Sequence, residues 1–165
     1  MEIEGTLKRS EVFLGLDDSD LAKIAALPSC RALDYQTGEM IFQAGKKAEY
    51  LYIIKEGQVD LVMEASSSSK QPTKVVIDRA TTGGTFGWSA LVKPHFYTGS
   101  AICAQSSKVV AVSGVELTAL FEQDNHLGYQ IYQRLCQVIG ARLRNIEQVL
   151  IKGKRWPFIE QTKSY

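Results

Sequence analysis

The feature that most limits what this chain can fold into is a series of short β-type runs in its middle half, separated by glycines. Most runs are rich in β-branched or aromatic side chains. Short strands with turn residues about every 8–12 positions indicate a β-sandwich or barrel. The runs are Met40–Phe42, Tyr50–Ile54, Val59–Met63, Val75–Ile77, Ser100–Ala104 and Val109–Val112. A polar stretch from Ser66 to Pro72 is predicted to be a solvated loop between two of them.

Helical patterns flank this β-region. Apolar residues cluster between Leu7 and Leu16, and Asp17 is placed to cap a following helix by accepting from its free amides. Pro28 lacks a backbone N–H and disfavours the helical conformation of its neighbour, so this helix is predicted to end there. After the β-region, a short helix is predicted around Leu117, Leu120 and Phe121.

A longer helix is predicted from Gly128 to Leu150. It would extend roughly 34 Å at 1.5 Å per residue, about the width of a small domain. Part of its apolar face is therefore expected to overhang the β-region, and we expect a homodimer through the 128–150 helix rather than packing wholly within one copy. That face comprises Ile131, Leu135, Val138, Ile139, Leu143, Ile146, Val149 and Leu150.

Composition narrows the class of protein. The 165 residues fit one domain, and 19 basic against 18 acidic residues give a net charge of +1, which does not favour nucleic acid. Three widely spaced cysteines, Cys30, Cys103 and Cys136, are expected to be reduced and partly buried. The chain shows no secretory signal and no membrane span, which predicts a cytoplasmic protein. The basic tail over 153–165 is expected to be solvated rather than bound to an acidic partner.

The segment from Thr81 to Ala104 carries the strongest functional signal. Gly83, Gly84 and Gly87 crowd one turn, and Ser89–Leu91 is placed to open a short helix. Free amides at a helix start favour an anion. No acidic residue lies between Asp78 and Glu116, while Arg79, Lys93 and Lys108 carry positive charge and His95 adds a titratable group. The segment is therefore expected to be locally positive and to suit an anion.

Four motifs in order resemble the cyclic-nucleotide-binding domain family, the sensor module of catabolite activators and of protein kinase A regulatory subunits. They are Leu7–Leu16, Tyr35–Gly45, Leu51–Val59 with a turn at Glu56–Gly57, and Phe86–Leu91. The resemblance implies a mainly β fold: a double-stranded β-helix, or jelly-roll-like β-roll, with an N-terminal helical bundle and a long C-terminal helix. The implied domain covers residues 1–152, with N-terminal helices over about 5–28, the roll over about 30–113 and C-terminal helices over about 115–152.

The chain departs from the family in its phosphate-binding cassette. There the family carries a glutamate that accepts from the ribose and an arginine that pairs with the cyclic phosphate. By resemblance, Trp88 stands in the glutamate position and Tyr97 in the arginine position, and no arginine occurs between Ala80 and Gln133. A charged hydrogen bond to phosphate contributes about 1.5–3 kcal/mol, so its loss weakens binding roughly tenfold to two-hundredfold.

Three hypotheses follow for this site. The first is a regulatory sensor that binds another small anionic or aromatic effector through the cassette amides, Thr98 and a stacking ring. The second is a scaffold or dimerisation module whose pocket is filled by Trp88 and Tyr97. The third is a weak binder of cyclic AMP or cyclic GMP. The predicted ligand-binding residues are Phe86, Gly87, Trp88, Ser89, Ala90, Leu91, Tyr97, Thr98 and Gly99.

Other classes of function have less support in the sequence. His95 and His126 are the only histidines and lie far apart, so no metal site and no metal cofactor is predicted. No nucleophile elbow and no Walker loop is present, so the chain is not expected to be an enzyme. Only fifteen residues follow Leu150, too few for a DNA-reading helix-turn-helix. The expected partners are therefore a small effector, a second copy and a downstream protein, with no DNA and no membrane.

Overall fold

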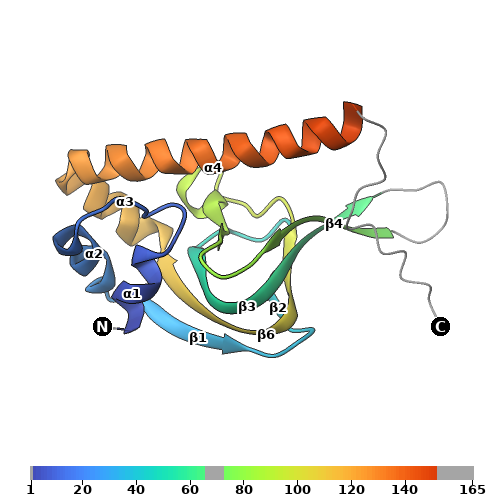
Figure 1. Ribbon diagram of the computed structural model, residues 1–165, viewed down its shortest axis with the longest axis horizontal. Helices are drawn as coiled ribbons and strands as arrows, with labels where there is room; N and C mark the ends of the chain where they lie inside the picture. Colours follow the sequence, from blue (N-terminus) through green and yellow to red (C-terminus); the bar gives the residue numbers. More distant parts are fainter. Residues whose placement is uncertain (1, 66–72, 152–165) are drawn as a thin grey trace.

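The computed structural model describes residues 2–65 and 73–151, with side chains over 2–64 and 74–144. The expected polar loop from Ser66 to Pro72 and the basic tail over 153–165 lie outside the described residues. Within the described part, a β-roll carries short helices at one end and a long helix across one side (Figure 1). No described helix is both long enough and apolar enough to cross a membrane.

Two short helices, α1 (Glu2–Lys8) and α2 (Asp18–Ala25), occupy the region expected to be helical over 5–28. The Asp17 carboxylate accepts from the Asp20 amide at 2.8 Å, as the sequence predicted for the cap of α2. Between the helices the chain turns at Gly15, whose φ of +92° is one that other residues rarely adopt. The helix ends three residues before Pro28, earlier than expected.

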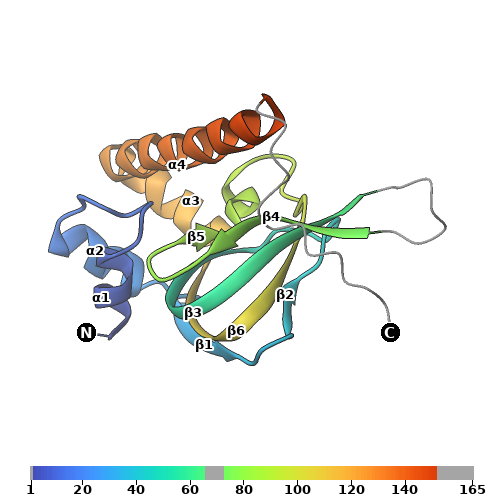
Figure 2. The same ribbon diagram turned by 45° about the vertical axis from the view of Figure 1, so that its right-hand side comes forward.

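Six antiparallel strands form the roll, as expected for a mainly β fold with flanking helices. They are β1 (Arg31–Tyr35), β2 (Met40–Phe42), β3 (Tyr50–Ala65), β4 (Thr73–Ala80), β5 (Thr85–Phe86) and β6 (Ser100–Ser113). The strand order is β1-β6-β3-β4, with β2 also pairing with β6 and β5 also pairing with β3. Figure 2 shows the sheet curling around its own interior, with β5 closing it toward the helices.

Strands β3 and β6 are each continuous where the sequence suggested two shorter strands. The expected hairpin turn at Glu56–Gly57 is therefore wrong. Glu56 still pairs with Lys108 of β6, and the register shifts on either side of it, which identifies a β-bulge. Gly57 has a φ of +97°, and a Cβ there would lie 2.4 Å from Ser107 Oγ. The glycine marks close approach of two strands, not a reversal of the chain.

The alternation of side chains along β3 divides the core into two clusters. Leu51 and Ile53 pack between the roll and the helices, whereas Tyr52 and Ile54 point into the roll. Successive strand residues face opposite sides of a sheet, and here both sides are covered. This explains why the run from Tyr50 to Ile54 is apolar throughout rather than alternating with polar residues.

Two helices follow the roll, α3 (Gly114–Gln123) and α4 (Asn125–Ile151). The first part of α4 is anchored by Leu127, Ile131 and Leu135, which are at most 2% exposed. Farther along, Leu143 is 53% exposed, although its spacing places it on the predicted apolar face. The helix lies lengthwise over the roll in Figure 1.

One side of α4 presents an apolar stripe to solvent. Its members follow one another at helical spacing and are all exposed: Tyr129, Tyr132, Cys136 and Leu143. Cys136 was expected to be partly buried like the other cysteines, and this expectation is wrong, because it lies on the solvent side of the helix. Cys103 is buried and Cys30 is half-buried, as predicted. Burial raises the pKa of the Cys30 thiol to about 11.

Candidate functional site

In the cassette, β5 ends at Phe86, and a single turn of 3-10 helix, η1 (Trp88–Leu91), follows after Gly87. Gly87 joins them with a φ of +77°, and a Cβ at this position would lie 2.8 Å from the Tyr50 carbonyl oxygen. Glycine is therefore required both by the conformation and by the close approach of β3. The turn sets η1 against the open edge of the roll interior.

A cavity of about 70 Å³ lies at this point, between η1 and the chain that leads into β6. Six of the nine residues predicted from sequence line it, from both ends of the segment: Gly87, Trp88, Ser89, Tyr97, Thr98 and Gly99. Phe42, Leu61 and Ile77 complete the lining. The fold therefore brings the two halves of the predicted site together. The cavity is several times smaller than the 300–1,000 Å³ typical of small-molecule sites.

The other three predicted residues do not line the cavity. Phe86, Ala90 and Leu91 are at most 6% exposed and belong to the core clusters. The expected cradle of free amides is also incomplete, because the Ala90 amide donates to the Gly87 carbonyl at 3.1 Å. A 3-10 turn bonds each amide three residues back, so it leaves fewer free donors than an α-helix.

Tyr97, in the position of the family arginine, is fixed inside the roll. Its ring stacks on Phe42, with 3.7 Å between ring centroids and 9° between planes. Its hydroxyl donates to the Tyr50 carbonyl at 3.0 Å and accepts from the Tyr50 amide at 3.3 Å. Burial raises the pKa of this hydroxyl, so it stays a neutral donor. The polar end of Tyr97 is therefore satisfied by backbone and is not directed at a ligand.

Tyr52 and Phe86 form a second stack beside the first, with ring centroids 5.1 Å apart and planes at 13°. The centroid of the Phe42 ring lies 5.8 Å from that of Tyr52 and 6.0 Å from that of Phe86. We call Phe42, Tyr52, Phe86 and Tyr97 the aromatic plug. Two of its rings, Phe42 and Tyr97, line the cavity, and all four pack together in the roll interior.

Trp88 stands at the outer side of the cavity, half-buried, and is covered by an arginine from α4. The Arg142 guanidinium carbon lies 4.5 Å from the centroid of the Trp88 ring, which is a cation–π contact. Nη2 of Arg142 donates to the Thr85 carbonyl at 2.9 Å and to Glu11 Oε1 at 2.8 Å. Its Nε lies 3.0 Å from Asp78 Oδ2. One side chain of α4 thus contacts the cassette and two further elements.

Arg142 was not predicted from the sequence, because it lies beyond the interval from Ala80 to Gln133 in which an arginine was expected by resemblance. One signal was available. Arg142 follows Leu135 and Val138 at helical spacing, so it falls on the apolar face of α4. A charge on a core-facing stripe needs a partner, and the fold provides it in Glu11 and Asp78.

The charges of the cassette segment itself are directed elsewhere. Lys108 pairs with Glu56 at 2.8 Å, and Arg79 pairs with Asp60 at 2.6 Å. Neither Lys93 nor His95 lines the cavity. Two acidic side chains of β3 thus pair with two of the three cations, so these charges are not directed at the cavity. Among the described residues, no cluster of three or more histidine, cysteine or acidic side chains is suited to a metal ion.

Comparison with known proteins gives consistent matches to one family. A family model described as "Cyclic nucleotide-binding domain" matches residues 32–124. A potassium channel protein of Rhodopseudomonas palustris is 24% identical over 153 residues, which are 93% of this chain and 35% of that protein. The chain therefore spans about a third of the length of that curated relative.

Solved structures agree with this match. A cyclic nucleotide-binding protein from Geobacter metallireducens is 28% identical, with a TM-score of 0.70 over 85% of this chain and 97% of that one. A cyclic nucleotide-binding domain from Methylobacillus flagellatus is 16% identical, with a TM-score of 0.77 over 96% and 85% of the two chains. The catabolite activator protein of Thermus thermophilus is 20% identical, with a TM-score of 0.66 over 86% and 62%. At these lower identities, the last two similarities concern the fold alone.

Proposed function

Because the chain belongs to the cyclic nucleotide-binding domain family, we propose that it is a regulatory module of that type whose cassette pocket is filled by its own aromatic side chains. In this proposal α4 is the output surface, and the partners are a second copy of the chain and a downstream protein. The module catalyses no reaction and acts in the cytoplasm. The observation that carries the proposal is the position of Tyr97, held in the roll interior by its stack on Phe42 and its two bonds to Tyr50.

The geometry favours this hypothesis over a different ligand in the same cassette. A ligand of nucleotide size needs several times the 70 Å³ that the cavity provides. To enlarge the cavity, Tyr97 would have to break two hydrogen bonds to buried backbone and lose its stacking partner. Each such loss costs about 1 kcal/mol or more. A ligand would have to offset that cost without the arginine and glutamate that the family uses.

Calorimetric titration tests the proposal directly. We expect the wild-type chain to give no saturable heat with cyclic AMP or cyclic GMP up to millimolar concentrations. The Tyr97→Arg variant removes the inner ring of the plug and restores a guanidinium in the family position. We expect it to bind cyclic AMP at least tenfold more tightly than the wild type, since a charged hydrogen bond to phosphate contributes about 1.5–3 kcal/mol.

The control is Tyr97→Phe, which keeps the ring and removes only the hydroxyl. It should bind cyclic AMP no better than the wild type, because the stack on Phe42 persists. Micromolar binding of either cyclic nucleotide by the wild type would overturn the filled-pocket proposal. A crystal of the wild type soaked in cyclic AMP would then locate the ligand.

The exposed stripe on α4 supports the second half of the proposal, a twofold dimer. Tyr129, Cys136 and Leu143 are exposed on one helix face, and Tyr132 beside them is 37% exposed although its ring contacts Phe121. Burial of apolar surface contributes about 25 cal/mol per Å², so covering this stripe with its own copy is favourable. A symmetric contact between two α4 helices places the same residues opposite each other.

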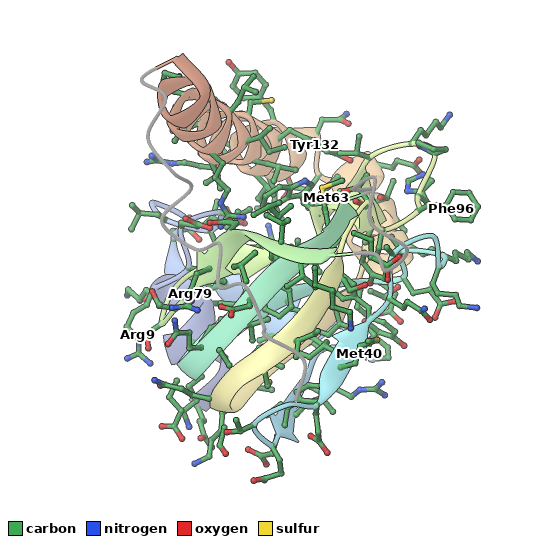
Figure 3. The ribbon with its side chains drawn as sticks, turned by 90° about the vertical axis from the view of Figure 1, so that its right-hand side faces the viewer. Arg9, Met40, Met63, Arg79, Phe96 and Tyr132 are labelled. Carbon is green, nitrogen blue, oxygen red and sulfur yellow. The ribbon has the colours of Figure 1, made fainter. Side chains whose placement is uncertain are left out.

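Sedimentation at several protein concentrations tests the dimer. We expect the wild type to sediment as a dimer and Leu143→Glu as a monomer, because two buried carboxylates would face each other across the twofold axis. Met40→Glu is the matched control, since Met40 on β2 is 48% exposed and lies on the side of the roll far from α4 in Figure 3. It should remain dimeric. A wild-type monomer at every concentration would remove dimerisation from the proposal.

A further inference from the structure

A second and much larger depression lies outside the cassette. It is a groove of about 680 Å³ between α4, the segment that follows α1, and the turn that joins β4 to β5. None of its lining residues lines the cassette cavity. Its volume falls within the range typical of small-molecule sites. Six charged side chains line it: Arg9, Glu11, Asp78, Arg79, Arg134 and Arg142.

The groove is lined by four arginines and only two acidic side chains. Arg142 pairs with both carboxylates of the groove: it donates a hydrogen bond to Glu11 and forms an ion pair with Asp78. Arg79 is held by Asp60, which lies outside the groove. The remaining two arginines have no acidic partner among the residues that the structure describes. Within the described residues, Arg134 bonds only the Gln137 amide oxygen, at 3.3 Å, and the Arg9 guanidinium has no hydrogen bond or ion pair.

One buried donor beside the groove has no hydrogen-bond partner in the described structure, Arg142 Nη1. Asp78 Oδ2 also accepts no hydrogen bond there, but it lies 3.0 Å from Arg142 Nε in an ion pair. Buried polar groups in folded proteins nearly always have a partner, so the free Nη1 donor is compatible with a bound acceptor. Figure 3 shows Arg9 and Arg79 on the same flank of the roll, on the side opposite Phe96. Arginines from three separate elements line the groove, and the guanidinium groups of Arg9 and Arg134 are the two without an acidic partner among the described residues.

These features match one ligand chemistry. A guanidinium group donates two parallel hydrogen bonds to phosphate, and several such groups around one groove suit linked phosphates better than a single anion. The two carboxylates on the floor can accept from hydroxyl or amine groups of the same ligand. We propose that this groove binds a small molecule that carries two or more linked phosphates. The proposal goes beyond the proposed function and does not depend on what the cassette binds.

Calorimetry with the full chain and two probes, inorganic tripolyphosphate and ATP, tests the groove. We expect saturable binding of both, with micromolar dissociation constants at low salt. Sulfate at equal ionic strength should bind at least tenfold more weakly, because one anion cannot engage all the guanidinium groups. Arg9→Ala and Arg134→Ala should each weaken binding of tripolyphosphate about tenfold or more, and the double variant should abolish it.

The matched control is Arg144→Ala, which removes the same charge from α4 outside the groove. It should change the dissociation constant less than twofold. All three variants should keep the wild-type denaturation midpoint, since neither Arg9 nor Arg134 forms an ion pair in the described structure. Equal weakening by all three variants, equal affinity for sulfate, or no saturable binding would each overturn the proposal. Binding of cyclic AMP in the cassette has no bearing on any of these results.

Discussion

Replacement of Phe86 by alanine is expected to lower the free energy of unfolding by about 3–5 kcal/mol, the usual cost of removing a fully buried phenylalanine. Phe86 is fully buried, pairs with Tyr52 across the β3–β5 ladder and contacts two rings of the aromatic plug. The roll cannot readily collapse around the space that is left, because β3 and β6 each pair with three other strands. Chemical denaturation followed by circular dichroism measures the change.

The same substitution at Phe96 is the matched control. Phe96 is 51% exposed, and Figure 3 shows its ring directed away from the roll. Its loss should change the stability by less than about 0.5 kcal/mol. A Phe86→Ala variant as stable as Phe96→Ala would mean that the plug does not hold the roll together. That result would favour the prediction that Phe86 contacts a ligand.

The second large effect is expected at the bulge in β3. Alanine at Gly57 must adopt a φ near +97° and place its Cβ 2.4 Å from Ser107 Oγ and 2.5 Å from the Ser106 carbonyl. The backbone conformation alone costs about 1–2 kcal/mol, and forcing β3 away from β6 adds about 1–3 kcal/mol. We therefore expect a loss of about 2–5 kcal/mol in the free energy of unfolding.

Gly38 separates the two contributions to this loss. Its φ is +86°, close to that of Gly57, but a Cβ there meets nothing within 4 Å. Gly38→Ala should therefore cost only the conformational part, about 1–2 kcal/mol. Equal losses at Gly38 and Gly57 would contradict the close packing of β3 against β6 at the bulge.

The elements of the fold were largely predictable, and their connections were not. Apolar periodicity predicted α2 and the two C-terminal helices, because that spacing reflects which face is buried. Runs of β-branched and aromatic residues between glycines predicted most strands. The prediction was wrong at Glu56–Gly57, where the glycine was interpreted as a turn. Glycine serves both for chain reversal and for close approach of two strands, and only the partner strand distinguishes the two uses. Ser107, fifty positions later, supplies that information.

For the candidate site, the sequence predicted where the cassette lies in the chain but not which side chains fill its pocket. The spacing brought Gly87 and Tyr97 to the same cavity, as expected from the resemblance. The direction of each side chain depended on distant residues. Tyr97 faces inward because Phe42 and the backbone of Tyr50 receive it, and Trp88 is covered by Arg142 from α4. Contacts between residues 45–55 positions apart leave no local pattern to read.

The central place of β6 determines when the roll can form during synthesis. Strands β1, β2 and β3 all pair with β6, which is the last strand among the described residues. At about 5–20 residues per second, a ribosome needs several seconds to pass from the end of β1 to the end of β6. During that time three strands with apolar faces have emerged without their main partner. The nascent chain is therefore most exposed to aggregation, and most dependent on chaperones, just before Ser113 leaves the ribosome.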